Sequence, residues 1–544
     1  MKIFTRIIPI FAMAFLSSTP LHAATDKGRA DYWLKSFKEI REGELRQRTA
    51  EVFKRVLAAA DRRKGVEPRV HVIDYGGLPW AQSLEDGSII LTKRAVEFCI
   101  KDRDKESGDA RLAFVLSHEL AHQLNADFWP YRFEASTKNN PEFSGVREFN
   151  RSPAAIKGME LEADQYGIIY AALAGFRTDV IVSKDVNFFK EWFRATERPP
   201  STSNHEDISL NQRVLVVTAR LNEASSRIEF FHAGVIAYHI GWYRESIALF
   251  NEFLKYYPGR EVYHNIGTAH LKLALKNYRE SRGMDSMPFY LSIEDDPSTR
   301  ADAIEVTRDD ENRPSREFRD NIEKSIDYLR KASESDPYYV MSKINLGAAY
   351  ILDARYYNAL SELEDAGKLG STDRKIVNNT AVAHFMIGEG LKDDVFKKKA
   401  YKDFEKAAKG ECARIFSINL SIAARRLGKT EENMTAEADE ELEGFIIPEN
   451  TIDERIGGTF KGDGYRSIGG ITVGRNQKLD LYEDMKNRVI VLVRNGVVKI
   501  AYRKVAGLNV NTEKRRCYES EVLVSKGKGA GMDTTRNTIF FYQK

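Results

Sequence analysis

Cysteine is scarce in this chain of 544 residues, which contains only three. Cys99, Cys412 and Cys517 are far apart and share no recurring spacing, so the sequence has no disulfide framework, and a chain this long does not need one. We expect them to be small buried side chains.

An excess of one charge is also missing, because 83 basic residues stand against 80 acidic ones. This balance gives no indication of binding to nucleic acid or to an acidic surface.

Long apolar runs are missing after the first two dozen residues. Residues 1–23 begin with Lys2 and Arg6, continue with the apolar run 7–16 and end in small residues, which is typical of a secretory signal peptide. The alternative is an uncleaved membrane anchor, but the run is shorter than a spanning helix requires. We therefore expect an exported protein, in the periplasm of a Gram-negative bacterium or secreted, with no membrane span after signal removal.

Residues 110–124 show the most informative pattern in the chain. Their apolar residues recur at helical spacing, which predicts a helix with one buried face, and Asp109 is the expected N-cap. His118 and His122 lie one turn apart on the same face. Two neutral imidazoles in this arrangement can bind Zn²⁺. Glu119, beside them, is the expected general base for a water molecule at the metal.

A third zinc ligand is expected from a second predicted helix, residues 154–175. Glu160 on that helix would complete a set of two histidines and one carboxylate, which leaves one position for water. Asp164, one turn further on, is placed to accept a hydrogen bond from a ligand histidine and so fix its tautomer. Residues 128–157 are predicted to form a long loop near the mouth of the site, either functional or disordered.

A small sheet is expected just before the first of these helices. Residues 69–73 alternate as a strand, and a second short run precedes the turn at residues 86–87 and the strand 88–92. An extended substrate can add to an exposed sheet edge through main-chain hydrogen bonds. The candidate edge strand contains Trp80, Ala81, Gln82 and Ser83.

Helical repeats are predicted from about Arg227 onward. Gly234, Phe250 and Pro258 stand at tetratricopeptide positions, and Gly267 follows at a similar period. Stacked repeats bury faces that a single repeat cannot bury, and their concave side is a surface for peptides or proteins. The alternative is an unrelated helical bundle. A clearer second unit contains Leu346, Gly347, Tyr350, Ala359, Leu363 and Ala366, and the polar residues 281–315 before it are predicted to be an inserted loop.

The last hundred residues have the composition of β-strands separated by turns. Residues 489–493 and 497–502 flank Asn495 and Gly496, which is a strong β-hairpin signal. We expect a small β-rich accessory domain of unknown role, suited to partner binding.

The predicted fold class is therefore mainly α: an α+β catalytic domain, an α-solenoid and a small β-rich C-terminal domain. The predicted boundaries are 1–23 for the signal peptide, 24–225 for a zinc metallopeptidase domain, 226–440 for the tetratricopeptide repeats and 441–544 for the β-rich domain.

The HExxH helix, the edge strand before it and the ExEAD helix after it together resemble the gluzincin metallopeptidases that include HtpX, BepA and the CAAX prenyl endopeptidase. The resemblance covers about residues 30–220 and is closest to the soluble, exported BepA-type branch. It implies that Glu160 is the third zinc ligand and that Asp164 supports a ligand histidine. Peptidases of this kind bind one zinc ion per chain.

The same resemblance implies roles for two residues after the second helix. In the family a histidine and an arginine follow that helix near the metal, and their nearest counterparts here are His205 and Arg213. His205 would occupy the open zinc position in a latent state, or either residue would stabilise the oxyanion of the tetrahedral intermediate. This sequence departs from the family, because Glu206 replaces the usual proline and the spacing is longer. The alternative for His205 is an ordinary surface histidine.

Two functions follow from these patterns. The first is an exported zinc endopeptidase that hydrolyses peptide bonds in misfolded or misassembled envelope proteins, with the repeats recruiting clients or envelope partners. The second is a binding protein of scaffold or chaperone type whose zinc site is structural or silenced. Glu119 favours the first, because a purely structural zinc site needs no base beside it.

Overall fold

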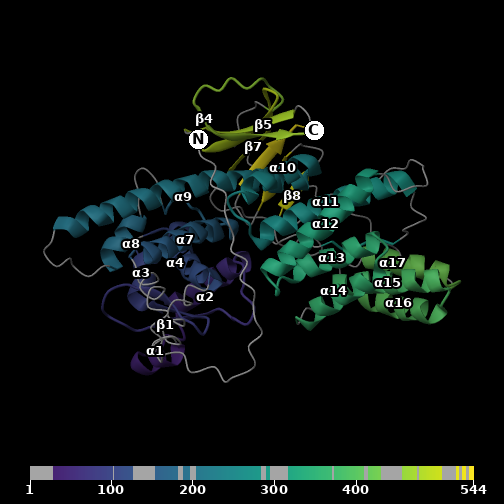
Figure 1. The fold of residues 1–544 in the computed structure, drawn as a ribbon, viewed down its shortest axis with the longest axis horizontal. Coiled ribbons are helices and arrows are strands. Elements are labelled where there is room, and N and C mark those ends of the chain that lie inside the picture. The colour runs from purple at the N-terminus through teal and green to yellow at the C-terminus, as the bar shows by residue number, and fades with distance from the viewer. Residues whose placement is uncertain are drawn as a thin grey trace, which may run out of the picture.

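The computed structural model describes residues 29–101, 103–125, 153–181, 188–196, 204–282, 289–293, 316–369, 373–409, 414–429, 456–474, 477–484, 486–504, 522–525, 530–533 and 538–543. The predicted signal peptide, most of the 128–157 loop, Cys412 and Cys517 lie outside these residues. Helices dominate the chain and a separate sheet lies near the C-terminus, so the predicted class is confirmed (Figure 1). Among the described residues, no helix combines the length and the apolar character that crossing a membrane requires.

The N-terminal region combines helices with a small sheet. Strand β3 pairs in parallel with β1 and antiparallel with β2, so the order is β1-β3-β2 and β2 lies at an edge. Every residue of β3 is buried, as a central strand covered on both faces requires. The elements are α1 (Ala30–Ser36), α2 (Glu44–Ala59), β1 (Arg69–Ile73), β2 (Ala81–Ser83), β3 (Ser88–Thr92), α3 (Lys93–Ile100), α4 (Lys105–Asn125), α7 (Pro153–Leu173) and α8 (Phe188–Thr196).

Helix α4 begins one turn earlier than the sequence predicted. The carboxylate of Asp104 accepts a hydrogen bond from the backbone N–H of Ser107 at 2.9 Å, which is the contact an N-cap makes. Asp109 lies inside the helix, where its carboxylate accepts a 2.5 Å bond from Arg48 on α2. The prediction of Asp109 as N-cap is therefore wrong, because Asp104 satisfies the first turn and Asp109 joins two helices instead.

In the part of the chain that the structure describes, nine helices form the region expected to contain repeats. Helix α9 is long and runs across residue 226, so the two predicted domains share one helix (Figure 1). Small residues lie where two helices touch: a Cβ on Gly234, Gly267 or Gly347 would meet Phe250, Leu329 or Leu363 within 3.0 Å. The helices are α9 (Asn204–His239), α10 (Tyr243–Leu254), α11 (Arg260–Arg282), α12 (Arg316–Ser335), α13 (Val340–Leu352), α14 (Tyr356–Lys368), α15 (Arg374–Leu391), α16 (Asp394–Ala407) and α17 (Arg414–Arg426).

The described C-terminal residues form an antiparallel sheet of seven strands in the order β4-β5-β6-β7-β10-β9-β8. The predicted hairpin is present as β6 and β7, with Asn495 and Gly496 at positive φ in its turn. The strands are β4 (Tyr465–Val473), β5 (Gln477–Asp484), β6 (Val489–Arg494), β7 (Val497–Lys504), β8 (Val522–Ser525), β9 (Ala530–Asp533) and β10 (Thr538–Tyr542).

A large hydrophobic core connects three parts of the chain. It includes Val56 and Leu116 from the N-terminal helices, Phe231 from α9, and Leu492 and Phe540 from one face of the C-terminal sheet. The sheet therefore packs on the helices through a continuous core and is not an isolated module. The helical array from α11 to α17 has a second core of its own, and the opposite face of the sheet has a smaller one.

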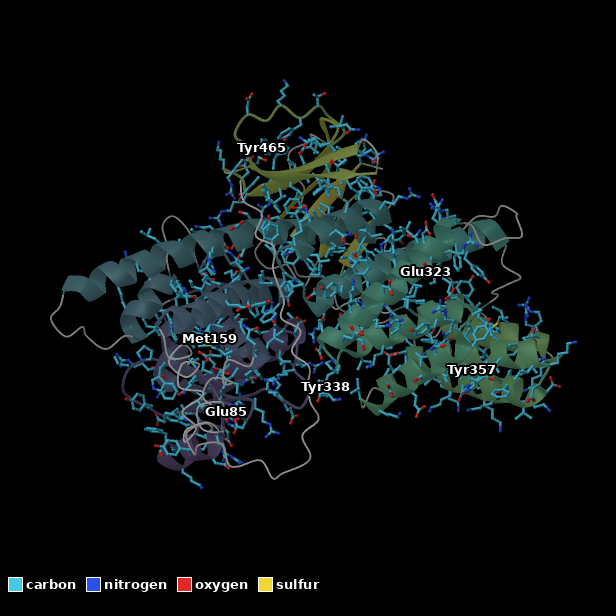
Figure 2. All side chains as sticks on the ribbon, viewed as in Figure 1. Glu85, Met159, Glu323, Tyr338, Tyr357 and Tyr465 are labelled. Carbon is cyan, nitrogen blue, oxygen red and sulfur yellow. The ribbon has the colours of Figure 1, made fainter. Side chains whose placement is uncertain are left out.

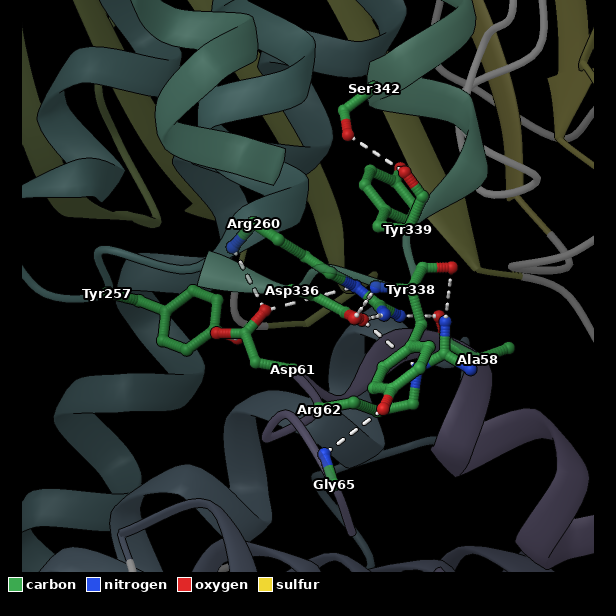
Figure 3. A network of polar contacts seen from close by, with 10 residues as sticks. All are labelled: Ala58, Asp61, Arg62, Gly65, Tyr257, Arg260, Asp336, Tyr338, Tyr339 and Ser342. Carbon is green, nitrogen blue, oxygen red and sulfur yellow. Dashed lines mark hydrogen bonds and ion pairs between the residues drawn. The ribbon is translucent and has the colours of Figure 1, made fainter. Parts of the chain in front are cut away.

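A buried charge network joins the N-terminal region to the array (Figure 3). Arg260, at the start of α11, forms an ion pair with Asp336 and donates its backbone N–H to Asp61 at 3.0 Å. Arg62 donates to the same Asp336 at 3.1 Å. Tyr338, labelled in Figure 2, lies where the array faces the N-terminal helices, and its hydroxyl accepts a 3.0 Å bond from the N–H of Gly65. Two acids, Asp61 and Asp336, and two arginines, Arg62 and Arg260, thus connect the N-terminal region to the helical array.

This network predicts a pH-dependent stability. Burial raises the pKa of the Asp61 carboxyl from 3.8 to about 6, although Arg260 opposes the shift. The fold therefore prefers the neutral carboxyl, so the stabilisation is complete below about pH 4 and is lost as the pH rises through 6. An asparagine side chain does not titrate, so the variant Asp61→Asn should not lose this stability as the pH rises. We expect the unfolding free energy of the variant, relative to that of wild type, to increase by on the order of 3 kcal/mol from pH 4 to pH 7. Urea unfolding of both proteins at each pH measures this difference, and a difference that does not change with pH would contradict the assignment.

Candidate metal centre

Helix α4 presents the two histidines of the candidate centre. His118 and His122 are both partly buried, and their Nε2 atoms are 3.1 Å apart. The helix can bring them this close because residues four apart lie one above the other on the same face. Both imidazoles therefore direct a ring nitrogen to one point beside α4.

Glu160 on α7 completes the cluster that the sequence predicted. Its carboxylate oxygens lie 3.6 Å from His118 Nε2 and 3.8 Å from His122 Nε2, and the three ligand atoms all lie within 4.8 Å of one another. A tetrahedral zinc ion with bonds of about 2.0–2.1 Å holds its ligand atoms about 3.3 Å apart. The three donors thus have the chemistry of a zinc set and nearly its spacing.

Asp164 determines which nitrogen of His118 faces the cluster. Its carboxylate lies 2.9 Å from Nδ1 of His118 and is almost fully buried. Burial would lower the pKa of His118, but hydrogen bonds to Asp164 and Glu160 outweigh it and hold that pKa well above the ordinary value. In the neutral ring, a proton on Nδ1 leaves a lone pair on Nε2, directed at Glu160 and His122. Three electron-pair donors facing one point are what a metal cation requires, so these residues fit zinc.

Glu119 is the buried carboxylate next to the first histidine. Burial raises the pKa of Glu119, while His118 and His122 lower it, and the net shift is upward. The backbone of Ser83 lies close enough to the Glu119 carboxylate to oppose this rise in pKa slightly. A carboxylate with a raised pKa is a stronger base than an exposed one and suits proton transfer near neutral pH.

Ser83 belongs to the predicted edge strand. The N–H of Leu84 points to β3, where it donates to Ser88. Because N–H groups alternate along a strand, the N–H of Ser83 points to the outer edge, toward Glu119. Ala81, Gln82 and Ser83 form β2, whereas Trp80 precedes the strand and packs against Trp33 at 5.1 Å between ring centroids. The sequence placed the edge correctly but offered no signal for its approach to Glu119.

His205 and Arg213 lie near the start of α9, but their side chains lie outside the part of the structure that is described. Their roles at the metal therefore stay predictions.

Gly167 is a site residue that the sequence did not single out. It lies on α7, and a Cβ there would come within 3.2 Å of the backbone nitrogen of His118 and 3.3 Å of its Cα. Because Gly167 has no side chain, α7 can lie close to α4 beside His118. The sequence did contain a signal for this close packing: a glycine within a predicted helix, seven residues after Glu160.

We expect Gly167→Ala to weaken zinc binding, because the new methyl group pushes the helix carrying Glu160 away from the helix carrying both histidines. The measurement is competition for zinc with a chelator. Gly158→Ala is the matched control, since Gly158 lies on the same helix and a Cβ there would meet no described atom within 4 Å. Equal affinities for the two variants would contradict this account of the glycine.

We expect Asp164→Asn to lower zinc affinity about 10- to 100-fold, as loss of a hydrogen-bonding partner behind a ligand histidine does. The amide keeps the shape of the carboxylate but loses the charge that favours the Nδ1 proton. The same competition measures the loss, with Glu162→Gln, an exposed carboxylate on the same helix, as control. Unchanged affinity in Asp164→Asn would show that Asp164 does not orient His118.

No protein-family model matches this chain, and no curated protein matches it.

Proposed function

We propose that this protein is a zinc-dependent endopeptidase of the gluzincin type, similar to HtpX and BepA. One observation carries the proposal: His118, His122 and Glu160 converge within 4.8 Å, with a buried carboxylate, Glu119, on the same helix as both histidines. A structural zinc site needs four protein ligands and no base. Three side chains that could bind a metal and a carboxylate that could act as a base support a catalytic rather than a structural site.

The residues of the chain divide the work of peptide hydrolysis. His118, His122 and Glu160 would hold the metal, and Asp164 would keep His118 in the tautomer that binds it. The chemistry that zinc supplies in such a set is polarisation of the scissile carbonyl and acidification of a water molecule. Glu119 accepts the proton of the attacking water and delivers it to the leaving amine, so that one water is consumed per bond broken.

The edge strand supplies a place for the substrate. An extended polypeptide that lies along the outer edge of β2 would be held by main-chain hydrogen bonds, whatever its side chains. Because Ser83 lies beside Glu119, a substrate held on this strand would lie close to the proposed base. We propose that unfolded segments of misfolded or misassembled envelope proteins bind in this way.

Helices α9–α17 fit the recruiting role. We propose that they form tetratricopeptide-type repeats, because small residues stand against large ones where paired helices meet, at Gly234, Gly267 and Gly347. The array would bind clients or envelope partners and present them to β2. An exported protein in the periplasm is the setting we propose, from the character of residues 1–23.

The test is metal-dependent hydrolysis by the purified mature chain. We expect one zinc per chain, cleavage of an unfolded protein such as casein, loss of cleavage with a chelator and recovery on adding zinc. Cleavage that survives complete zinc removal would overturn the proposal. A chain that binds no zinc at all would overturn it as well.

A scaffold whose zinc site does no chemistry is the second candidate, supported by the size of the helical array. The two functions differ in a deletion strain. If the protein is a scaffold, Glu119→Gln restores the wild-type phenotype and removal of the array does not. If it is a peptidase, Glu119→Gln fails to restore it.

A further inference from the structure

One short segment of the chain packs on the helical array without belonging to a helix or a strand. Residues 289–293 fall within the predicted inserted loop, yet Phe289 and Leu291 belong to the core of the array. The ring of Phe289 lies 4.9 Å from that of Phe385 on α15 and 5.3 Å from that of Phe404 on α16. The segment is therefore bound to the array by its side chains at alternate positions, as an extended peptide would be.

Each of two asparagines binds both the backbone N–H and the backbone carbonyl of one residue in this segment. Asn379 on α15 accepts a 2.9 Å bond from the N–H of Ser292 and donates a 2.7 Å bond to its carbonyl. Asn419 on α17 does the same for Tyr290, accepting at 2.7 Å and donating at 2.8 Å. A side-chain amide carries one acceptor and two donors, so it can imitate a neighbouring β-strand. These contacts recognise a main chain and not a particular side chain.

A third asparagine connects the other two. Asn378 donates to the carbonyl of Tyr290 at 3.2 Å and to the Oγ of Ser292 at 3.0 Å, and its own carbonyl accepts a 2.8 Å bond from Asn419. All three asparagines are fully buried. A buried amide is costly unless its hydrogen bonds are made, and here the backbone of Tyr290 and Ser292 supplies most of the partners.

The asparagines follow the register of the array. The first helix of each successive pair, and the helix that follows the last pair, carries asparagine five residues after its start. Asn345 donates to Thr268 on the preceding helix pair at 2.9 Å, so the polar row continues across the array. The four residues are Asn265 on α11, Asn345 on α13, Asn379 on α15 and Asn419 on α17.

We propose that α15, α16 and α17 form a groove for an extended polypeptide segment, and that residues 289–293 occupy it as an internal ligand. The partner is a protein segment with an aromatic residue, any residue and then an aliphatic one, matching Phe289, Tyr290 and Leu291. Asn379 and Asn419 bind its main chain, and the pocket formed by Phe385 and Phe404 binds its aromatic ring. Such a segment displaces the internal one by taking over the same contacts. The groove binds without hydrolysis, so the proposal stands apart from the peptidase function.

The test uses the full-length chain and a fluorescent peptide with the sequence of residues 287–295. In wild type the internal segment competes at high effective concentration, so binding is weak. In Phe289→Ala/Leu291→Ala the internal competitor is weakened, and we expect the peptide to bind about tenfold tighter or more by anisotropy. Adding Asn379→Leu to this variant should weaken binding about tenfold or more. Zinc is omitted, so failure of the peptidase proposal leaves this result unaffected.

Peptides methylated on one backbone nitrogen make the test sharper. Methylation at the position of Ser292 removes the N–H that Asn379 accepts and should abolish binding, whereas methylation at Leu291 is the matched control and should leave most of it. Equal binding of the two methylated peptides, or no gain from the double variant, would overturn the proposal. If the double variant does not fold, hydrogen exchange in wild type decides the question. An excess of the unmodified peptide should then accelerate exchange at Tyr290 and Ser292, and unchanged exchange would overturn the proposal.

Discussion

Glu119→Gln should retain zinc and lose hydrolysis of an unfolded protein by about 10²- to 10⁴-fold, the range typical of removing a general base. Glutamine keeps the size of the side chain and one carbonyl oxygen, so the packing around this position is retained. It cannot take up a proton, and the attacking water is then left without a base. The measurement pairs zinc content with the initial rate of cleavage, so that loss of the metal and loss of the base are separated.

Glu106→Gln is the control for this experiment. Glu106 lies in the first turn of the same helix, is partly exposed and forms a long 4.0 Å ion pair with Arg177. Its substitution should leave both zinc content and rate unchanged. If Glu119→Gln binds zinc and cleaves as fast as wild type, Glu119 is not the base and the mechanism is wrong.

Arg260→Leu should destabilise the fold by about 3–5 kcal/mol, the usual effect of removing one partner from a buried ion pair. The side chain of Arg260 is 2% exposed, and its loss leaves Asp61 and Asp336 buried near each other, with Arg62 as the remaining arginine of the network. Repulsion between the two acids adds to the cost of burying them. Urea unfolding at pH 7.5, where both carboxyls are ionised in the unfolded chain, measures the effect.

Two further variants test the cause of that loss. Arg244→Leu removes an arginine that is 65% exposed and paired with Glu317 at 3.1 Å, so we expect a change below about 0.5 kcal/mol. Adding Asp61→Asn and Asp336→Asn to Arg260→Leu should recover much of the stability, because the two buried acids are then neutral. A loss that persists in the triple variant would show that packing of the arginine, rather than its charge, stabilises the junction.

The sequence predicted those residues of the candidate site that lie close together along one helix. His118, Glu119 and His122 fall within about one helical turn, and Glu160 and Asp164 stand at helical spacing on another segment. The approach of Ser83 to Glu119 was not predictable, because it depends on how an edge strand packs on a helix. Residues that act through tertiary packing leave no periodic signal in the sequence.

The fold shows the same limit. Turn chemistry and apolar periodicity predicted the β6–β7 hairpin and the helices of the array, because both depend on near neighbours. The Arg260, Asp61 and Asp336 cluster joins residues far apart in the chain, and nothing local marks any of them as buried. The row of asparagines was accessible in principle, since it recurs at one position of successive helices, but only after the helix starts were known.

The continuity of the main core has a consequence for biosynthesis. Because Phe540 in β10 packs into the same core as Leu116 on the helix of the two histidines, that core stays open until Phe540 has been translated. The candidate metal ligands leave the ribosome long before the strand that completes their surroundings. A growing chain therefore closes this core only after Phe540 has emerged, and the surroundings of the two histidines are completed by a strand made more than 400 residues later.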